Sequence, residues 1–213
     1  MTARLLGRWP DRSPEWYAAR AGRIGGSDIG VVMGWYLTDP LGRPLKTREQ
    51  LLDEKVNNPG PPDRKPSKAT DRGTYCEPAI AAWLADSAGL TYDDAWTGTW
   101  VDDHDDRWMY NPDAVTSDGR LVEFKTTEVR DASHGWGRAR SDQVPLPYAA
   151  QVQWGMGILG LTECLVGVLA GSPKFEFARY RVRFDPDVFA YLRANAEAFM
   201  AQVEATKQKA DRS

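Results

Sequence analysis

The chain has 213 residues, a formal net charge of −3, 42% hydrophobic residues and nine tryptophans. This composition can fill a sizeable hydrophobic core, and we expect a single domain over residues 1–213. The two cysteines, Cys76 and Cys164, are too few for a disulfide framework or a four-thiolate iron–sulfur site. No 18-residue apolar span is present, so we expect a cytoplasmic protein without membrane contact. The net charge excludes a uniformly basic nucleic-acid coat but allows a local basic cleft.

The N-terminal part predicts a short helix followed by a glycine turn. The order Ser13-Pro14-Glu15 is typical of a helix start, and Gly22 of its end, so we expect a helix over 14–21 that carries Trp16 and Arg20. The next stretch, "RIGGSDIGVVMG", predicts a second helix start with Ser27 or Asp28 as N-cap. The first amides of such a helix favour an anion such as phosphate; an ordinary capped helix is the alternative.

Residues 55–70 contain four prolines and several basic side chains, which is typical of a mobile basic loop. A helix is expected over 73–87, with Pro78 in its first turn. Its carboxylate Glu77 would project from the same side as Ile80, toward the core. The alternative is a solvated acid stabilised by the helix dipole.

The remaining elements predict a mixed α/β sandwich around one sheet. A meander of three strands is expected first, with an Asp-Gly turn before its last strand, then a helix that starts at Pro147, then two strands and a closing helix. The predicted strands are 95–101, 107–111, 121–127, 163–170 and 174–183, and the closing helix is 185–207.

The stretch "NPDAVTSDGRLVEFKTT" carries the candidate chemistry. Strand alternation places Glu123 and Lys125 on one face and Val122 and Phe124 on the other. Opposite charges on one face of an apolar strand are costly unless something there requires them. Asp113 stands ten residues before Glu123, across the predicted hairpin, and can return to the same face.

Two carboxylates beside an ammonium group predict a metal site. Mg²⁺ is held by one or two carboxylates together with water and substrate phosphate oxygens, and Mn²⁺ has similar preferences. Metal-bound water is more acidic than bulk water, and the lysine can orient it or stabilise transition-state charge. The predicted reaction is metal-assisted phosphodiester hydrolysis; a plain cross-strand salt bridge is the alternative.

Asp113, Glu123 and Lys125 resemble the Pro-Asp…(Asp/Glu)-x-Lys signature of the restriction-endonuclease-like nucleases. Within this superfamily the chain resembles the YqaJ-like viral recombinases, the family of phage lambda exonuclease. The further matches, in a fixed order between Ser13 and Gly160, are Trp16 with Arg20, "IGGSDIG", "GTYCE" ending at Glu77, and "YAAQVQWGM" from Tyr148. The resemblance implies a restriction-endonuclease-like α/β core, with a central mixed β-sheet flanked by helices. One departure is Ala114, where many relatives have glycine.

The resemblance also implies a role for each matching residue of the metal site. Asp113, Glu123 and the backbone carbonyl of Phe124 would bind the metal, and Glu77 would add a carboxylate near a second one. Lys125 would act on the attacking water. A further match, Gln151, would orient the lysine and the substrate.

By the same resemblance, Arg20 and Ser27 would receive the 5′-phosphate of a DNA end, with Gly26 and Tyr148 in the same DNA-binding set. The implied activity is a Mg²⁺-dependent 5′→3′ exonuclease on linear double-stranded DNA. Its 3′ overhangs would pass to a single-strand annealing partner in the host cytoplasm. Several relatives form ring-shaped trimers, so a homotrimer is implied too. An endonuclease and a non-catalytic DNA-end-binding module are the alternatives.

Overall fold

The computed structural model describes residues 3–39, 41–57, 60, 68–210 and 212. Its strands form one sheet of three strands and one of four. The helices of the described chain are α1 Pro14–Arg20, α2 Gly26–Val32, α3 Arg48–Asn57, α4 Lys68–Ala88, α5 Leu146–Leu159 and α6 Pro186–Ala210. Short 3₁₀ turns lie at Asp94–Trp96 and Ala132–His134.

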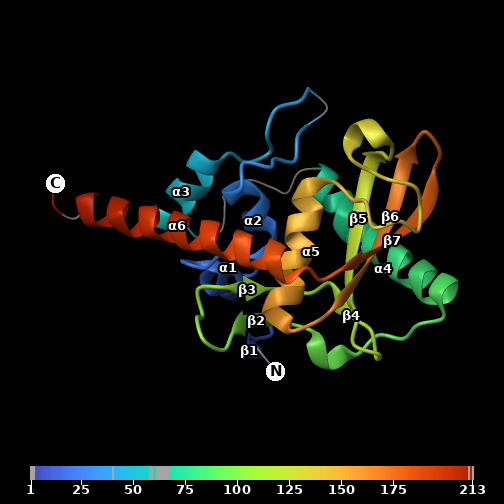
Figure 1. Ribbon diagram of the computed structural model, residues 1–213, viewed down its shortest axis with the longest axis horizontal. Coiled ribbons are helices and arrows are strands. Elements are labelled where there is room, and N and C mark those ends of the chain that lie inside the picture. The colour runs from blue at the N-terminus through green and yellow to red at the C-terminus, as the bar shows by residue number, and fades with distance from the viewer. Residues whose placement is uncertain (1–2, 40, 58–59, 61–67, 211, 213) are drawn as a thin grey trace.

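The four-stranded sheet has the order β4 Ala114–Val115, β5 Leu121–Val129, β6 Glu163–Ser172, β7 Glu176–Arg183. Strands β5 and β6 are parallel, whereas the β4–β5 and β6–β7 pairs are antiparallel. A parallel pair needs a crossover connection, and helix α5 supplies it. Figure 1 shows β5, β6 and β7 side by side, with α5 to their left. The predicted mixed sheet flanked by helices is confirmed.

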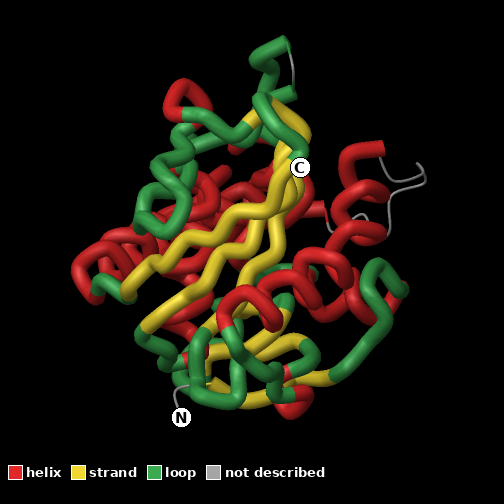
Figure 2. Tube along the Cα trace, turned by 90° about the vertical axis from the view of Figure 1, so that its right-hand side faces the viewer, coloured by secondary structure: helices red, strands yellow, loops and turns green. Residues whose placement is uncertain are grey.

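Helices cover both faces of this sheet, and Figure 2 shows the strands running between them. On one face Ile80 and Leu84 of α4 pack on Val122, Phe124 and neighbouring apolar residues. On the other face α5 and α6 enclose the larger core, which contains both Trp154 and Phe199. Because α5 is buried on most of its circumference, it is apolar almost throughout.

The second sheet has the order β1 Ala3–Gly7, β2 Thr99–Asp102, β3 Met109–Tyr110, with both pairs antiparallel. The expectation of one sheet was therefore wrong. Strand β5 pairs across the Asp-Gly turn with β4, not with β3, because the chain leaves the first sheet at Asn111 and Pro112. The predicted strand 95–101 starts only at Thr99, since Asp93 caps a 3₁₀ turn before it.

The largest helix correction concerns residues 55–88. Residues 55–57 belong to α3 and 68–70 to α4, so both ends of the predicted loop are helical; residues 58–59 and 61–67 lie outside the described part of the chain. Helix α4 starts before Gly73, so Pro78 lies inside it and not in its first turn. Packing of Ile80 and Leu84 on the sheet holds the helix beyond the proline.

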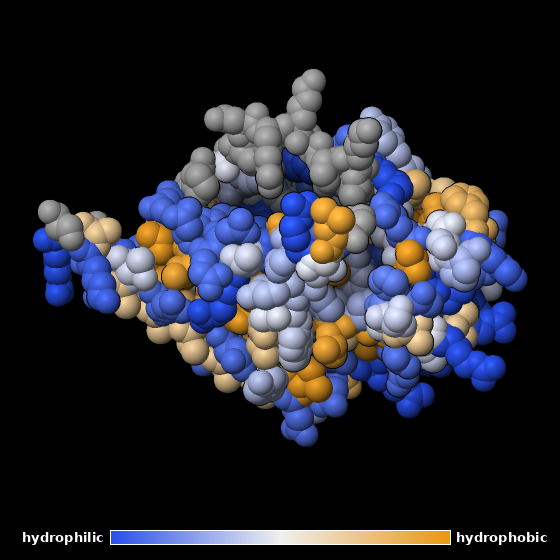
Figure 3. Space-filling view, turned by 90° about the horizontal axis from the view of Figure 1, so that it is seen from above, coloured by the Kyte–Doolittle hydropathy of each residue, from blue (hydrophilic) through white to orange (hydrophobic). Residues whose placement is uncertain are grey.

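The other predicted helices and strands are confirmed to within a few residues at their ends. Figure 3 shows hydrophilic residues over most of one face of the molecule, with hydrophobic residues in small separate patches. None of the helices in the described ranges combines the length and the apolar character needed to cross a membrane.

Gly155 of α5 lies directly against the ring of Tyr110, and a Cβ atom there would come within 2.4 Å of Cζ. We expect Gly155→Ala to lower the free energy of unfolding by about 1–3 kcal/mol, because the buried ring cannot move away. Gly73→Ala is the matched control, since a Cβ in that helical position meets nothing within 4 Å. It should be neutral or stabilising by up to about 1 kcal/mol in the same urea titration. Equal effects of the two substitutions would contradict this packing.

Candidate active site

Strand β5 carries the candidate active site on the face that looks toward α5. Strand alternation sends Val122 and Phe124 into the cluster under α4. Glu123 and Lys125 therefore point to the opposite face, as the sequence predicts. Glu123 is only 1% exposed, whereas 16% of the Lys125 side chain remains accessible.

Three donors from three different elements converge on the Glu123 carboxylate. The hydroxyl of Tyr110 in β3 donates to Oε2 at 2.6 Å. Lys125 Nζ and Gln151 Nε2 of α5 both donate to Oε1 at 2.5 Å. Gln151 also accepts from Lys125 Nζ through its own oxygen at 3.2 Å. A buried carboxylate is costly unless it is paired and hydrogen-bonded, and this arrangement meets both conditions.

The titration of these groups follows from the same geometry. Burial lowers the pKa of Lys125, but the charges of Glu123 and Asp113 outweigh it and raise that pKa overall. Burial, together with the charge of Glu123, raises the pKa of Tyr110 well above its ordinary value. At neutral pH Lys125 is therefore an ammonium group and Tyr110 a hydrogen-bond donor.

Asp113 reaches the site from the segment between β3 and β4. Its Oδ2 accepts from the backbone N–H of Phe124 at 2.7 Å. The residue is exposed, but protein atoms crowd its carboxyl group, and this desolvation, with the charge of Glu123, raises its pKa well above the usual value. The carboxyl also borders a cavity of about 190 Å³ beside Phe124. Ala114, the departure noted above, pairs with Val122 and leaves the hairpin intact.

Glu77 lies in the middle of α4 and not near its N-terminus, and its exposure shows that the expected orientation toward the core, on the side of Ile80, was wrong. The residue is exposed, and partial shielding of its carboxyl group raises its pKa. Lys125 lowers that pKa, and the charges of Asp11 and Glu123 raise it further. Glu77 therefore shares the electrostatic field of the site, although no hydrogen bond joins it to Asp113 or Glu123 in the described residues.

Within the described ranges, no group of three or more His, Cys, Asp and Glu side chains is close enough to hold a metal ion. The donor set that does fit a hard cation is smaller: Asp113, Glu123 and the carbonyl between Glu123 and Lys125. Desolvation is the main cause of the raised pKa of Asp113, and the charge of Glu123 adds to it, so a cation between these two carboxylates would favour their charged forms.

The glycine turn forms around Asp28, which is 2% exposed. The N-cap of α2 is Gly25 and not Ser27 or Asp28, because the Asp28 carboxylate reaches back to the Gly25 N–H at 3.1 Å. The same carboxylate pairs with Lys55 Nζ at 3.1 Å and lies 3.7 Å from Arg20 Nη2. The Gly25 N–H is thus already satisfied, and the Asp28 carboxylate itself brings negative charge to the start of the helix, so the cationic side chains become the more important groups for binding an anion.

Arg20 and Ser27 meet at the outer side of this turn. Arg20 Nη2 donates to Ser27 Oγ at 3.0 Å, and its guanidinium lies 4.5 Å from the ring centroid of Trp16. Ser27 is exposed, and 18% of the Arg20 side chain is accessible. Arg20 and Ser27, to which the family resemblance gives one shared role, are therefore in direct contact and accessible to solvent.

Gly26 connects the turn to the Glu123 cluster, that is, Glu123 with its three donors Tyr110, Lys125 and Gln151. A Cβ atom at Gly26 would lie 2.4 Å from Tyr110 Cε2 and 3.1 Å from Gln151 Cγ. The turn therefore packs on the two side chains that bind Glu123. Tyr148 lies nearby on α5, with its ring centroid 5.0 Å from Lys125 Nζ.

Two partners of this region were missed by the sequence interpretation. Tyr110 was read only as part of a strand, although its alternation with Trp108 indicates a buried position. Lys55 was assigned to a solvated loop, but it is 2% exposed and pairs with Asp28. Its helical spacing from the buried Leu51 was the available signal.

Comparison with known proteins decides the family. Residues 15–164 match the YqaJ-like viral recombinase domain. The chain belongs to this family. Among curated proteins none matches.

Solved structures agree on the fold of this YqaJ-like domain. The alkaline exonuclease LHK-Exo from Laribacter hongkongensis is 21% identical with a TM-score of 0.69, and the match covers 94% of this chain and 97% of that one. Its complex with dAMP gives 20% identity and a TM-score of 0.70 over the same shares. A phage related exonuclease from Haemophilus somnus 129PT is 9% identical with a TM-score of 0.63, covering 88% and 96%. At these identities the likeness establishes the restriction-endonuclease-like fold, as predicted.

Acid should weaken the Asp28–Lys55 pair. Burial by itself raises the pKa of Asp28, but Lys55 and Arg20 outweigh it and hold that pKa well below its ordinary value of 3.8. Such a carboxyl contributes stability above the unfolded-state pKa, near 3.9, and loses it as the pH falls through the folded-state pKa. Urea titrations between about pH 6 and about pH 3 should therefore show a steeper loss of stability in the wild type than in Asp28→Asn. Identical slopes would contradict the pairing.

Proposed function

We propose that this YqaJ-like domain is a Mg²⁺-dependent exonuclease that degrades one strand of linear double-stranded DNA in the 5′→3′ direction. It starts from 5′-phosphorylated ends and leaves 3′ overhangs. The observation that carries the proposal is the contact of two groups of residues. The Glu123 cluster, beside Asp113, adjoins the Arg20–Ser27 pair through Gly26.

Asp113, Glu123 and the carbonyl of Phe124 would hold Mg²⁺, or Mn²⁺ in its place, and Glu77 would add a carboxylate near a second ion. The bound ion supplies acidified water and charge stabilisation for phosphodiester hydrolysis. The chain itself fixes the carboxylates: Tyr110 holds one oxygen of Glu123, and the Phe124 N–H holds one oxygen of Asp113.

Lys125 and Gln151 act on the reacting groups. Lys125 is held by Glu123, by the oxygen of Gln151 and by the face of the Tyr148 ring. An ammonium group fixed in this way orients the attacking water and stabilises the charge that develops on the phosphate oxygens. Gln151 keeps the lysine and the substrate aligned, because its amide bridges Lys125 and Glu123.

Arg20 and Ser27 would bind the terminal 5′-phosphate, and this contact would set the polarity. A guanidinium and a hydroxyl in contact are suitable donors for a phosphate. The Asp28 charge beside them is compensated by Lys55. An enzyme that cuts within a strand does not need a receptor for a terminal phosphate, so the pair favours end-dependent cleavage.

Family and neighbours extend the proposal to partners. LHK-Exo has been solved with dAMP, which agrees with mononucleotides as the product here. In a viral recombination pathway, located in the host cytoplasm, the 3′ overhang would pass to a single-strand annealing protein. A homotrimer is the assembly that the family resemblance implies, and sedimentation of the purified chain tests it.

The deciding assay measures nucleotide release from linear plasmid DNA with 5′-phosphate ends, beside the same plasmid as a closed circle. We expect Mg²⁺-dependent degradation of the linear form only, and none with EDTA. Cleavage of the circle would indicate an endonuclease. Binding without cleavage of either form would indicate a DNA-end-binding module.

In the same assay Lys125→Ala should reduce the rate by about 100-fold or more, because its charge acts mainly in the transition state. DNA binding, measured in EDTA, should stay within about threefold. A thermal melt checks that loss of one donor to Glu123 leaves the variant folded. Near-normal turnover in the folded variant would remove Lys125 from the mechanism.

Arg20→Ala should act selectively on 5′-phosphorylated ends. We expect its KM for these ends to rise about tenfold, which corresponds to about 1.4 kcal/mol, with little change on 5′-hydroxyl ends. Arg43→Ala is the control, because Arg43 is 73% exposed and pairs only with Asp39 in the described structure. An equal loss on both kinds of end would argue against a phosphate receptor.

A further inference from the structure

A cavity of about 280 Å³ lies on the face of the four-stranded sheet that looks away from Glu123 and Lys125. Leu165 of β6 lies in it and belongs to the same cluster as Val122 and Phe124 under α4. The cavity is therefore separated from the candidate active site by the sheet itself. Its lining residues are Ala88, Arg120, Arg140, Leu165, Arg179, Tyr180 and Arg181.

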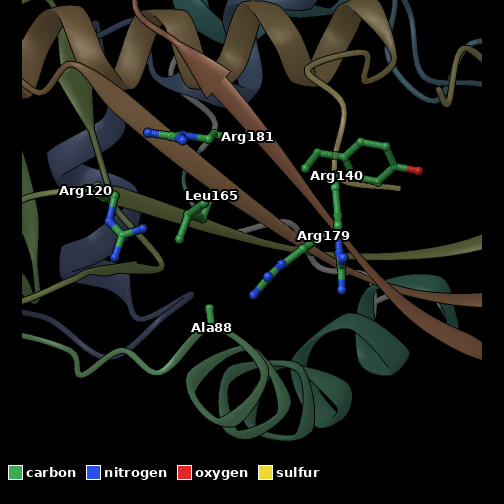
Figure 4. Close-up of a pocket in the computed structure, with 7 residues that line it drawn as sticks. Ala88, Arg120, Arg140, Leu165, Arg179 and Arg181 are labelled. Atoms are coloured by element: carbon green, nitrogen blue, oxygen red, sulfur yellow. The ribbon is translucent and has the colours of Figure 1, made fainter. Parts of the chain in front are cut away.

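The cavity exists because α4 ends before the sheet does. The helix stops at Ala88, and Gly89, with φ +61°, turns the chain away. Leu165 is 5% exposed and borders the cavity, and it pairs in register with Val122 on one side and Arg181 on the other. Figure 4 shows Leu165 between Arg120 and Arg179, with Ala88 facing it across the cavity.

Four guanidinium groups surround these apolar side chains, and only two carboxylates balance them. Arg181 pairs with Glu163 at 2.5 Å, and Arg120 pairs with Asp118 at 2.7 Å. The other two arginines have no carboxylate partner in the described chain, so the cavity carries an excess of positive charge on a protein of negative net charge.

These two arginines are held at the rim by the backbone. Arg179 donates through Nη1 to the carbonyl of Ser87 at 2.8 Å, which leaves its charge uncompensated. Arg140 has φ 72°, an uncommon conformation for a residue with a side chain, and its N–H donates to the Arg179 carbonyl. Arg181 in turn donates to the Ser141 carbonyl. This loop thus occupies the edge of β7 beside the cavity.

We propose that this arginine cavity docks an acidic peptide of a partner protein, with carboxylates on the guanidiniums and one apolar side chain on Leu165 and Ala88. Guanidiniums bind carboxylates through paired hydrogen bonds. The apolar centre gains free energy only from an apolar group of the ligand. A DNA backbone brings phosphates but no such group, and the active-site face lies on the other side of the sheet. Strand addition is excluded at the edge that the 140–141 loop occupies.

The test uses fluorescein-labelled peptides and fluorescence polarisation. The probe has four aspartates followed by leucine; the comparison peptides replace the leucine by glycine, or the aspartates by asparagines. We expect the first peptide to bind with a Kd below about 1 mM and the others at least about fivefold more weakly. No binding of the first peptide, or equal binding of the glycine peptide, would overturn the proposal.

Variants locate the binding. Arg140→Gln and Arg179→Gln should each weaken binding of the aspartate–leucine peptide about fivefold or more. Arg138→Gln is the matched control, an exposed arginine of the same loop that does not line the cavity. Equal losses in all three, or none, would refute docking in the cavity.

A labelled single-stranded oligonucleotide provides the last arm. If its affinity falls in Arg140→Gln as much as that of the peptide, the surface binds nucleic acid and the peptide proposal fails. Release of nucleotides from linear DNA should be unchanged in both cavity variants. The peptide-docking proposal can therefore fail while the exonuclease proposal holds, and the exonuclease proposal can fail while peptide docking holds.

Discussion

The burial of the Glu123 carboxylate is the constraint on which the arrangement of this molecule depends. A charge that is 1% exposed needs donors, and they come from β3, β5 and α5. The Tyr110 hydroxyl can reach it only because Gly26 and Gly155 leave room for the ring. The two carboxylate oxygens of Glu123 are thus the point at which the two sheets and the crossover helix α5 meet, and the glycine turn packs against the same donors. Any metal chemistry on β5 inherits this rigidity, because the carboxylate cannot rotate without losing its donors.

The buried Asp28–Lys55 ion pair likewise fixes the position of neighbouring side chains, at the glycine turn beside the Glu123 cluster. It connects α2 to α3 through two side chains that are each 2% exposed, and it holds Arg20 nearby. A buried ion pair is weak evidence for stability, but removing one partner leaves an uncompensated charge. Its value here lies in orientation, since it places Arg20 beside Ser27 and leaves the guanidinium accessible on the Trp16 ring.

Local patterns in the sequence predict those parts of the site that lie close together along the chain. Strand alternation is enough to place Glu123 and Lys125 on one face, and the Asp-Gly turn brings Asp113 back to the same strand. The partner of Lys55 could not be found in this way, because its burial depends on how α3 packs on α2. The separation into two sheets could not be found in this way either. Local sequence patterns identify the strands, but they do not show that β3 pairs with β2 while β5 pairs with β4. Glu77 was misplaced because Pro78 is a common first-turn residue, while α4 continues through it.

Charge is distributed over the two faces of the four-stranded sheet in opposite ways, and alternation along β5, β6 and β7 is the cause. On the α5 face, acidic groups crowd around one lysine, which suits a cation and a phosphate that arrive together. On the α4 face, arginines surround Leu165, which suits carboxylates attached to an apolar group. A net charge of −3 hides both features, because they cancel in the sum. One sheet can therefore present two separate binding surfaces, since a ligand on either face is kept apart from the other by the sheet itself.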